Sequence, residues 1–159
     1  MAGDYSVEIR RVARIPTAVI RRRVRRDELS RVVPECCGLV WSALKAEGKR
    51  GGRNVALYRE AGAVVEAGVE LQTPFAAAGD IVLSELPEGV AAATVHYGPY
   101  GGLGGAHAAV QQWCRANGHA FGHVCWEIYD HWRDEWNADP SRIRTDVCYE
   151  LAGSPRQSS

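Results

Sequence analysis

The chain repeats itself once, and this internal repeat constrains the fold more than any single motif. Repeated sequence usually means a repeated structural unit, so both halves are expected to fold alike. Four sequence features recur in the same order at offsets of 70 to 72 residues: Ile15-Pro16 and Leu86-Pro87, Trp41 and Trp113, Gly48 and Gly118, and Tyr58 and Tyr129.

The first half predicts a βαββ unit. Residues 7–24 are rich in β-branched side chains and predict a strand that is broken or bulged at Pro16. A helix follows, with Pro34 in its first turn and Gly48 at its end. Residues 54–58 and 64–71 predict two further strands. The apolar stripe of the helix consists of Cys37, Val40, Trp41 and Leu44.

The second half repeats this order. Residues 81–97 predict a strand interrupted at 87–89, and a helix follows that ends at Gly118. Strands are predicted at 124–132 and 145–151. The apolar face of this helix consists of Leu103, Ala106, Val110 and Trp113.

Two such units predict an α+β fold with a mostly antiparallel sheet and two helices on one face. The two βαββ repeats are expected to be related by a pseudo-twofold axis, with a central cleft at their seam. We expect a single domain over residues 1–152, with repeats at about 7–72 and about 80–151. Residues 153–159 are expected to form a disordered tail.

Composition excludes several classes of protein. Lys plus Arg and Asp plus Glu each number 19, so the net charge of zero argues against generic nucleic-acid binding. The five cysteines include no C-x-x-C spacing, which favours reduced thiols over a disulfide framework or a zinc site. The first residues lack the basic start and apolar stretch of a signal peptide, and no apolar run approaches 18 residues. We therefore expect a cytoplasmic protein without a cofactor or a membrane partner.

The strand at 124–132 carries the main chemical signal. With a period of two, Val124, Trp126 and Ile128 share one face, which is expected to pack beneath the helices. Glu127 and Tyr129 share the other face with Cys125 and His131. In the repeat, Tyr129 corresponds to Tyr58 but Glu127 corresponds to Ala56. The scaffold therefore does not need an acid at this position, which indicates a functional role for Glu127.

Three roles are open for Glu127. The carboxylate could simply face water or pair with an arginine, as most strand glutamates do. If it is desolvated, it needs a partner, and a cationic ligand among aromatic rings would provide one. With a raised pKa, it could instead act as a general acid or base.

Several short segments resemble the GyrI-like family, which includes the effector-binding domains of AraC-type and MerR-type regulators. The resemblance extends from about Val7 to Leu151. Each motif is short, and their order and spacing carry the resemblance. The segments are Trp41 to Gly48, Ala56-Leu-Tyr58, His96-Tyr-Gly-Pro-Tyr100, Glu127-Ile-Tyr129 and Thr145-Asp-Val-Cys-Tyr149.

The resemblance implies a cleft that binds amphipathic, aromatic or cationic small molecules. The family's pocket glutamate falls on Glu127. Its aromatic wall falls on Tyr58, Tyr97, Tyr129 and Tyr149, with Trp41 and Trp132 as further candidates.

Two features depart from the family's pattern. No helix-turn-helix segment precedes Val7, so we expect a freestanding domain without sequence-specific DNA binding. A glycine-rich segment, residues 101–105, precedes the second helix.

The resemblance also implies two alternative functions. Some relatives are hydrolases that open the cyclopropane of DNA-alkylating natural products. In that case Glu127 would be catalytic, with Tyr129 or Tyr58 assisting. Another relative inhibits DNA gyrase, which would make the chain a protein-interaction module.

An arginine-rich segment suggests a surface for such a partner. Nine arginines and three acids lie between Glu8 and Arg31. Their alternation also fits a solvated strand face, so both interpretations stay open. The candidate contact residues are Arg21, Arg22, Arg23, Arg25 and Arg26.

Two further motifs have structural explanations. His119, His123 and Cys125 have metal-ligand spacing, but Gly118 and Gly122 would break the helix needed to gather them, so no metal is expected. Cys36-Cys37 opens the first helix, where a thiol can have a lowered pKa, but buried packing is the favoured interpretation.

Overall fold

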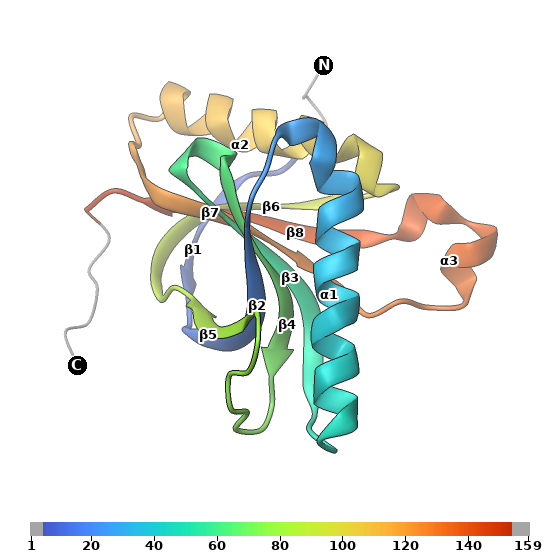
Figure 1. Cartoon of the computed structure of the whole chain (residues 1–159). Helices are drawn as coiled ribbons and strands as arrows, with labels where there is room; N and C mark the ends of the chain where they lie inside the picture. Colours follow the sequence, from blue (N-terminus) through green and yellow to red (C-terminus); the bar gives the residue numbers. More distant parts are fainter. Residues whose placement is uncertain (1–4, 154–159) are drawn as a thin grey trace.

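The computed structural model describes residues 5–153, which form one eight-stranded antiparallel sheet with two long helices (Figure 1). The predicted tail, apart from Gly153, lies outside the described residues. No helix within residues 5–153 is long and apolar enough to cross a membrane. The elements in chain order are β1 (Glu8–Val12), β2 (Ile15–Arg23), α1 (Leu29–Ala46), β3 (Gly51–Arg59), β4 (Val64–Leu71), β5 (Ile81–Leu86), β6 (Gly89–Tyr97), α2 (Leu103–Ala116), β7 (Phe121–Tyr129), α3 (Glu135–Ala138) and β8 (Arg144–Leu151).

The strand order shows the predicted pseudo-twofold arrangement. The sheet runs β1-β6-β8-β7-β3-β4-β2-β5, so the equivalent strands β3 and β7 pair at its centre. Ala56 lies directly opposite Glu127 in this pair. Because these two residues are also equivalent in the repeat, the local twofold axis passes between them. Glu127 therefore occupies the centre of the molecule's internal symmetry.

The two halves exchange their first strands. β1 pairs with β6 of the second half, and β5 pairs with β2 of the first half. Each repeat therefore has one strand more than the predicted βαββ unit. The first predicted strand breaks at Ala13 and Arg14 instead of Pro16, which lies inside β2. Pro16 is placed where β2 pairs with β5 alone, a position that tolerates a residue without an N–H.

Both long helices cover the same face of the sheet. α1 packs Cys37 and Leu44 against β2, β3 and β4, and α2 packs Val110 against β6 and β8. The opposite face has its own apolar cluster, which includes Trp126 and Ile128. The sheet is consequently buried on both sides near its centre.

The alternation predicted for β7 is confirmed, but its faces are the reverse of those expected. Trp126 and Ile128 lie on the face without helices, whereas Tyr129 packs with the clusters beneath both helices. The strand period fixes which side chains share a face, not which face a helix covers. The uncovered face is also apolar because Val12 and Leu86, from the two edge strands, pack onto it.

Helix α1 begins at Leu29, five residues before Pro34, which lies inside the helix. A short 3₁₀ turn precedes it, in which the Glu28 carboxylate accepts the backbone N–H of Arg25 at 2.8 Å. Val32 and Val33 are buried in the first turns of α1. This apolar contact and the preceding turn extend the helix beyond the start that the proline predicts.

The helices repeat at an offset of 70 residues. Gly48 and Gly118 both end a helix with positive φ, at 64° and 74°. The N–H groups that follow them bond equivalent carbonyls, those of Leu44 and Cys114, at 2.9 and 2.8 Å. At this offset Trp41 corresponds to Gln111, so its sequence match to Trp113 is not a structural equivalence.

After the helices, the offset between equivalent residues of the two repeats changes from 70 to 71, and this change occurs within two β-bulges. The register shifts between Gly51 and Asn54 in β3 and between Phe121 and Cys125 in β7, and the second bulge is one residue longer. β7 therefore runs from 121 to 129 instead of the predicted 124–132. The bulge brings Tyr58 and Tyr129 into equivalent positions on either side of Glu127.

Candidate functional site

The carboxylate of Glu127 is enclosed beneath the helices with both oxygens hydrogen-bonded. The residue is 4% exposed. Oε1 accepts hydrogen bonds from the hydroxyl of Tyr58, at 2.8 Å, and from the hydroxyl of Tyr129. Oε2 lies 2.7 Å from Nε2 of His107. β3, β7 and α2 thus each supply one partner to the same acid.

A second layer of contacts holds His107. Its Nδ1 lies 2.7 Å from the hydroxyl of Tyr149 on β8, which also accepts from Nε2 of Gln111 at 2.9 Å. The imidazole ring lies edge-on to Tyr149, with ring centroids 5.5 Å apart. The network therefore continues from Glu127 through His107 to Tyr149.

The environment of Glu127 keeps it ionised. Burial alone would raise the pKa of this carboxyl, but the hydrogen bond and charge of His107 and the two tyrosine hydroxyls outweigh it and lower the pKa. The raised pKa considered for a general acid is therefore wrong. Burial and the charge of Glu127 raise the pKa of Tyr58 and Tyr129 well above the ordinary value, so both phenols stay protonated hydrogen-bond donors.

The repeat explains how this geometry arises. Tyr58 and Tyr129 each lie two residues from the axis, so the symmetry directs both hydroxyls toward the centre. Ala56 has no polar group and leaves room across the strand for the Glu127 side chain. A single acid with symmetric phenol donors is the result.

His107, Gln111 and Tyr100 were missed by sequence reasoning. A signal for His107 exists, because Leu103, His107 and Val110 follow the spacing of one helix face. Gln111 lies one turn beyond His107. Tyr100 belongs to the motif before α2, and its ring contacts Tyr129 edge-on at 5.5 Å.

Trp41 lies on the α1 side of the site. Its indole Nε1 donates to Oδ1 of Asn54 at 2.6 Å, and Asn54 pairs with Tyr129 across the sheet. The half-buried ring packs on the same apolar cluster as Tyr129. Of the aromatic residues predicted to line the cleft, Tyr58 and Tyr129 thus bond the acid directly and Tyr149 reaches it through His107. Trp41 packs in the apolar cluster that contains Tyr58 and Tyr129.

Tyr97 and Trp132 are not brought to the carboxylate. Tyr97 is 61% exposed and shares the face of β6 that holds Ala91 and Ala93, away from the helices. Trp132 follows β7, is 51% exposed and donates to Asn137 at 3.2 Å. Neither ring lies beside Glu127, because the strand boundaries and strand faces differ from the expected ones, and a role of Tyr97 and Trp132 in binding a ligand stays a prediction.

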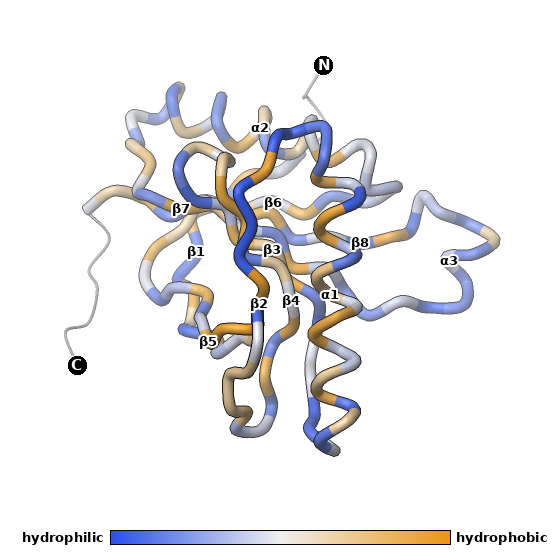
Figure 2. The backbone as a smooth tube through the Cα atoms, viewed as in Figure 1, coloured by the Kyte–Doolittle hydropathy of each residue, from blue (hydrophilic) through white to orange (hydrophobic). Residues whose placement is uncertain are grey.

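The arginine-rich segment lies at the end of β2 and before α1, where Figure 2 shows a hydrophilic stretch. Arg22 donates to the carbonyl of Arg21 at 3.5 Å. Binding of an acidic protein partner here stays a prediction. Ion pairs within the chain leave fewer arginine charges free for such a partner than the sequence alone indicates. Three of the five candidate contact residues form ion pairs within the chain: Arg21 with Glu66, Arg23 with Glu60 and Arg25 with Asp27.

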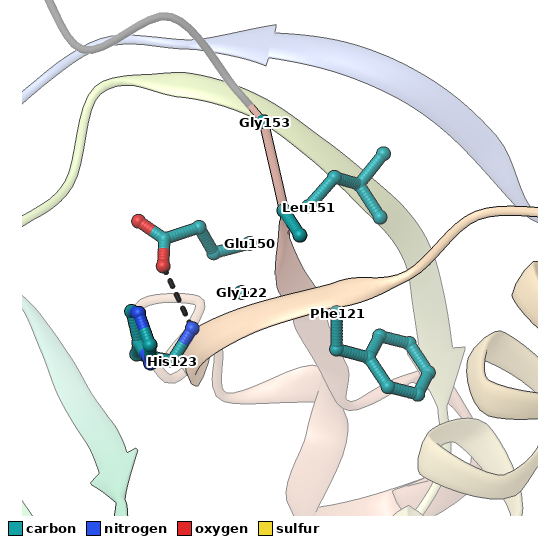
Figure 3. A pocket seen from close by; sticks show the side chains of 7 residues that line it. Phe121, Gly122, His123, Glu150, Leu151 and Gly153 are labelled. Carbon is teal, nitrogen blue, oxygen red and sulfur yellow. Dashed lines mark hydrogen bonds between the residues drawn. The ribbon is translucent and has the colours of Figure 1, made fainter.

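The structure also contains a cavity of about 280 Å³, apart from the predicted site (Figure 3). It lies at the bulge of β7 and the end of β8, where Glu150 accepts the backbone N–H of His123 at 3.0 Å. None of the predicted cleft residues lines it. The lining residues are Phe121, Gly122, His123, Glu150, Leu151, Ala152 and Gly153.

The two remaining candidate motifs are the possible metal ligands near β7 and the cysteine pair of α1. His119 stacks on Trp113 with ring centroids 5.4 Å apart. Within the described range, no three His, Cys, Asp or Glu side chains are grouped as metal ligands. Burial raises the pKa of Cys36, and raises that of Cys37 to about 12, so neither is the activated thiol that a helix start could produce.

The arrangement of the sheet and helices defines the class of fold, and solved structures share it. The sequence itself matches no protein-family model and no curated protein. The C-terminal domain of EcmrR superimposes with a TM-score of 0.75 at 21% identity, covering 93% of this chain and 98% of that domain. In the EcmrR–DNA complex, the likeness spans 57% of the EcmrR chain, with a TM-score of 0.77 at 19% identity.

Two other solved structures share the fold, one of them with a bound organic cation and the other a hydrolase. SAV2435 bound to tetraphenylphosphonium has a TM-score of 0.62 at 10% identity, with 93% of this chain and 94% of that chain covered. A hydrolase from Listeria innocua has a TM-score of 0.59 at 13% identity, with 92% and 91% covered. At these identities the likeness establishes the fold. The fold implied by the GyrI-like resemblance is therefore confirmed.

Proposed function

We propose that this chain binds an amphipathic, aromatic organic cation in the seam beneath α1 and α2, with Glu127 as the anionic anchor. The observation that carries the proposal is a buried, ionised carboxylate at a position where the equivalent repeat has Ala56. An acid that the scaffold does not require, placed on the symmetry axis, is best explained by a ligand.

A comparison with Glu66 supports this role. Glu66 is 1% exposed, but it lies on the other face of the sheet and is neutralised by two guanidinium groups. Arg21 and Arg59 both approach its Oε2, at 2.7 and 2.9 Å. Glu127 has only neutral phenols and one imidazole. Of these two buried acids, Glu127 is therefore the one that a cationic ligand can still stabilise.

The aromatic groups around the anchor suit a lipophilic cation. The rings of Tyr58 and Tyr129 lie beside the carboxylate, and Trp41 packs in the same apolar cluster. Each ring that reaches the ligand can contribute roughly 0.5–2 kcal/mol through cation–π contact. Because Glu127 is buried, the ligand must enter by displacing a helix. The segment before and within the first turn of α2, residues 100–105, is glycine-rich and mostly exposed, which favours movement there.

Isothermal titration with tetraphenylphosphonium tests the proposal. The wild-type chain should bind it, and Glu127→Gln should weaken binding at least about tenfold, because the charge of the anchor is lost at constant size. Glu66→Gln is the matched control, since it also neutralises a buried acid but on the other face. Equal loss in both variants, or none in Glu127→Gln, would contradict the proposal.

A second candidate is hydrolysis of an electrophilic cyclopropane. The observation in its favour is an ionised carboxylate in direct contact with protonated phenols, which supplies a base and acids at one point. Glu127 would take a proton from water, and Tyr58 or Tyr129 would donate one to the opening ring. Mass spectrometry of a cyclopropane alkylator mixed with the chain should then show addition of one water, abolished by Glu127→Gln. An unchanged alkylator after many hours would exclude turnover.

A further inference from the structure

We infer that His107 is a specificity-determining residue: it is the chain's own counter-ion for Glu127, and a cationic ligand must compete with it for Oε2. The inference rests on the proposed function. It implies that the site binds a permanent cation more tightly when His107 is neutral, and that binding releases a proton when His107 starts protonated.

The contacts of Glu127 leave one oxygen for this competition. Oε1 is shared by the hydroxyls of Tyr58 and Tyr129, which carry no charge. Oε2 is held by His107 at 2.7 Å, and His107 can become cationic. A ligand cation that approaches Oε2 therefore meets either a neutral imidazole that can be displaced or an imidazolium that already neutralises the acid.

The hydrogen-bond network accommodates both charge states. An ionised carboxylate only accepts, so Nε2 of His107 carries a hydrogen in each state. With neutral His107, the Tyr149 hydroxyl donates to Nδ1, and the group keeps a net charge of −1. With protonated His107, Nδ1 donates to the Tyr149 oxygen, whose own hydrogen turns away from the imidazole, and the net charge is zero.

The other titratable groups around His107 do not account for a rise of cation affinity with pH. The pKa of Glu127 is lowered from 4.5, so this acid does not change charge near neutral pH. On β6, His96 lies beside Gly102 at the start of α2, where Tyr5 and the carbonyl of Pro99 hold its two nitrogens. Burial raises the pKa of the remaining groups, which stay neutral: Tyr58 on β3, Cys125 and Tyr129 on β7, Tyr149 on β8 and Tyr100 before α2.

The sign of the effect follows from linkage. Protonation of His107 removes the net negative charge that attracts the ligand, so the affinity for a cation should rise with pH through the titration of the imidazole. Where His107 is mostly protonated, the dissociation constant should fall by up to about tenfold per pH unit. It should become constant where His107 is neutral.

The test is titration calorimetry with tetraphenylphosphonium at a series of pH values from about pH 5.5 to about pH 8, the range in which a histidine side chain can change charge. His107→Gln is the decisive variant, because its amide can still donate to Oε2 but does not titrate. We expect affinity to rise with pH in the wild type and to be constant in His107→Gln. Two buffers of different ionisation enthalpy should show release of up to one proton by the wild type at low pH.

Each outcome separates the two proposals. Binding that depends on Glu127 but has the same pH dependence in His107→Gln would overturn the inference and leave the proposed function intact. Proton uptake, or no proton exchange, by the wild type across the whole range would also overturn it. Failure to bind at every pH would remove both. The wild-type proton count does not depend on the folding of the variant.

Discussion

Glu127 shows how one residue can carry both a functional charge and a stability contribution. Its carboxylate loses hydration on burial, and three hydrogen-bond donors replace it. Its lowered pKa means that the folded state favours the ionised form more than the unfolded chain does. This contribution is present above the unfolded pKa, near 4.5, and is lost as pH falls through the folded pKa.

Replacement of Glu127 by Gln should therefore destabilise the chain in a pH-dependent way. At neutral pH we expect a loss of roughly 1–2 kcal/mol, because charge-assisted hydrogen bonds become neutral ones of similar geometry. The difference from the wild type should shrink as pH falls below about 4.5. Urea denaturation at both pH values measures it, and a difference that grows in acid would contradict the assigned charge state.

At the same scale, the sequence predicts the acid and its phenols better than it predicts their surroundings. Glu127 and Tyr129 share a face by the strand period alone, and the repeat adds Tyr58. Tyr97 was misplaced because the alternation along β6 does not say which face lies beneath the helices. His107 comes from another element, so only the helix spacing could have indicated it.

At the scale of single elements, close approach of β2 and β4 depends on one glycine. A Cβ on Gly68 would lie 2.0 Å from the carbonyl oxygen of Ala18 and 2.8 Å from the Cα of Val19. These are backbone atoms of the neighbouring strand, which cannot move away without breaking the pairing.

Gly68→Ala should thus lower the free energy of unfolding by at least about 3 kcal/mol. Gly104→Ala is the control, since a Cβ there meets nothing within 4 Å on the exposed side of α2. This control should stabilise the chain by about 0.5–1 kcal/mol through helix propensity. Thermal unfolding followed by circular dichroism compares them, and a mild effect at Gly68 would refute the close approach of the strands.

The boundaries of the elements were less predictable than their order. Pro34 indicates a helix start, but buried Val32 and Val33 and the preceding turn extend α1 toward its N-terminus. A tertiary contact outweighed the local preference. Likewise, the bulge in β7 adds a residue that no periodicity reveals. The strand ends at Tyr129, so Trp132 lies outside it.

At the scale of the whole molecule, exchange of the first strands makes the two halves interdependent. β1 completes the sheet of the second half, and β5 completes that of the first. The central β3–β7 pair joins them again. The repeat predicted similar halves, but an exchange of strands cannot be deduced from similarity, because either pairing would bury the same apolar faces.

Separated halves should fold only together. A cut between Ala77 and Ala78, in an exposed connection, gives fragments 1–77 and 78–159. Each alone should lack cooperative unfolding because it loses its exchanged edge strand, and an equimolar mixture should form a folded heterodimer. Circular dichroism and size-exclusion chromatography measure this. Cooperative folding of either isolated fragment would contradict the interdependence of the halves.

The account depends most on where a cation binds, and a crystal structure with tetraphenylphosphonium locates it directly. We predict that the phosphorus lies in the seam beneath α1 and α2, close to the Glu127 carboxylate, and that His107 has left Oε2. A cation seated only in the cavity lined by Phe121 and His123, with His107 still on Glu127, would contradict the central claim.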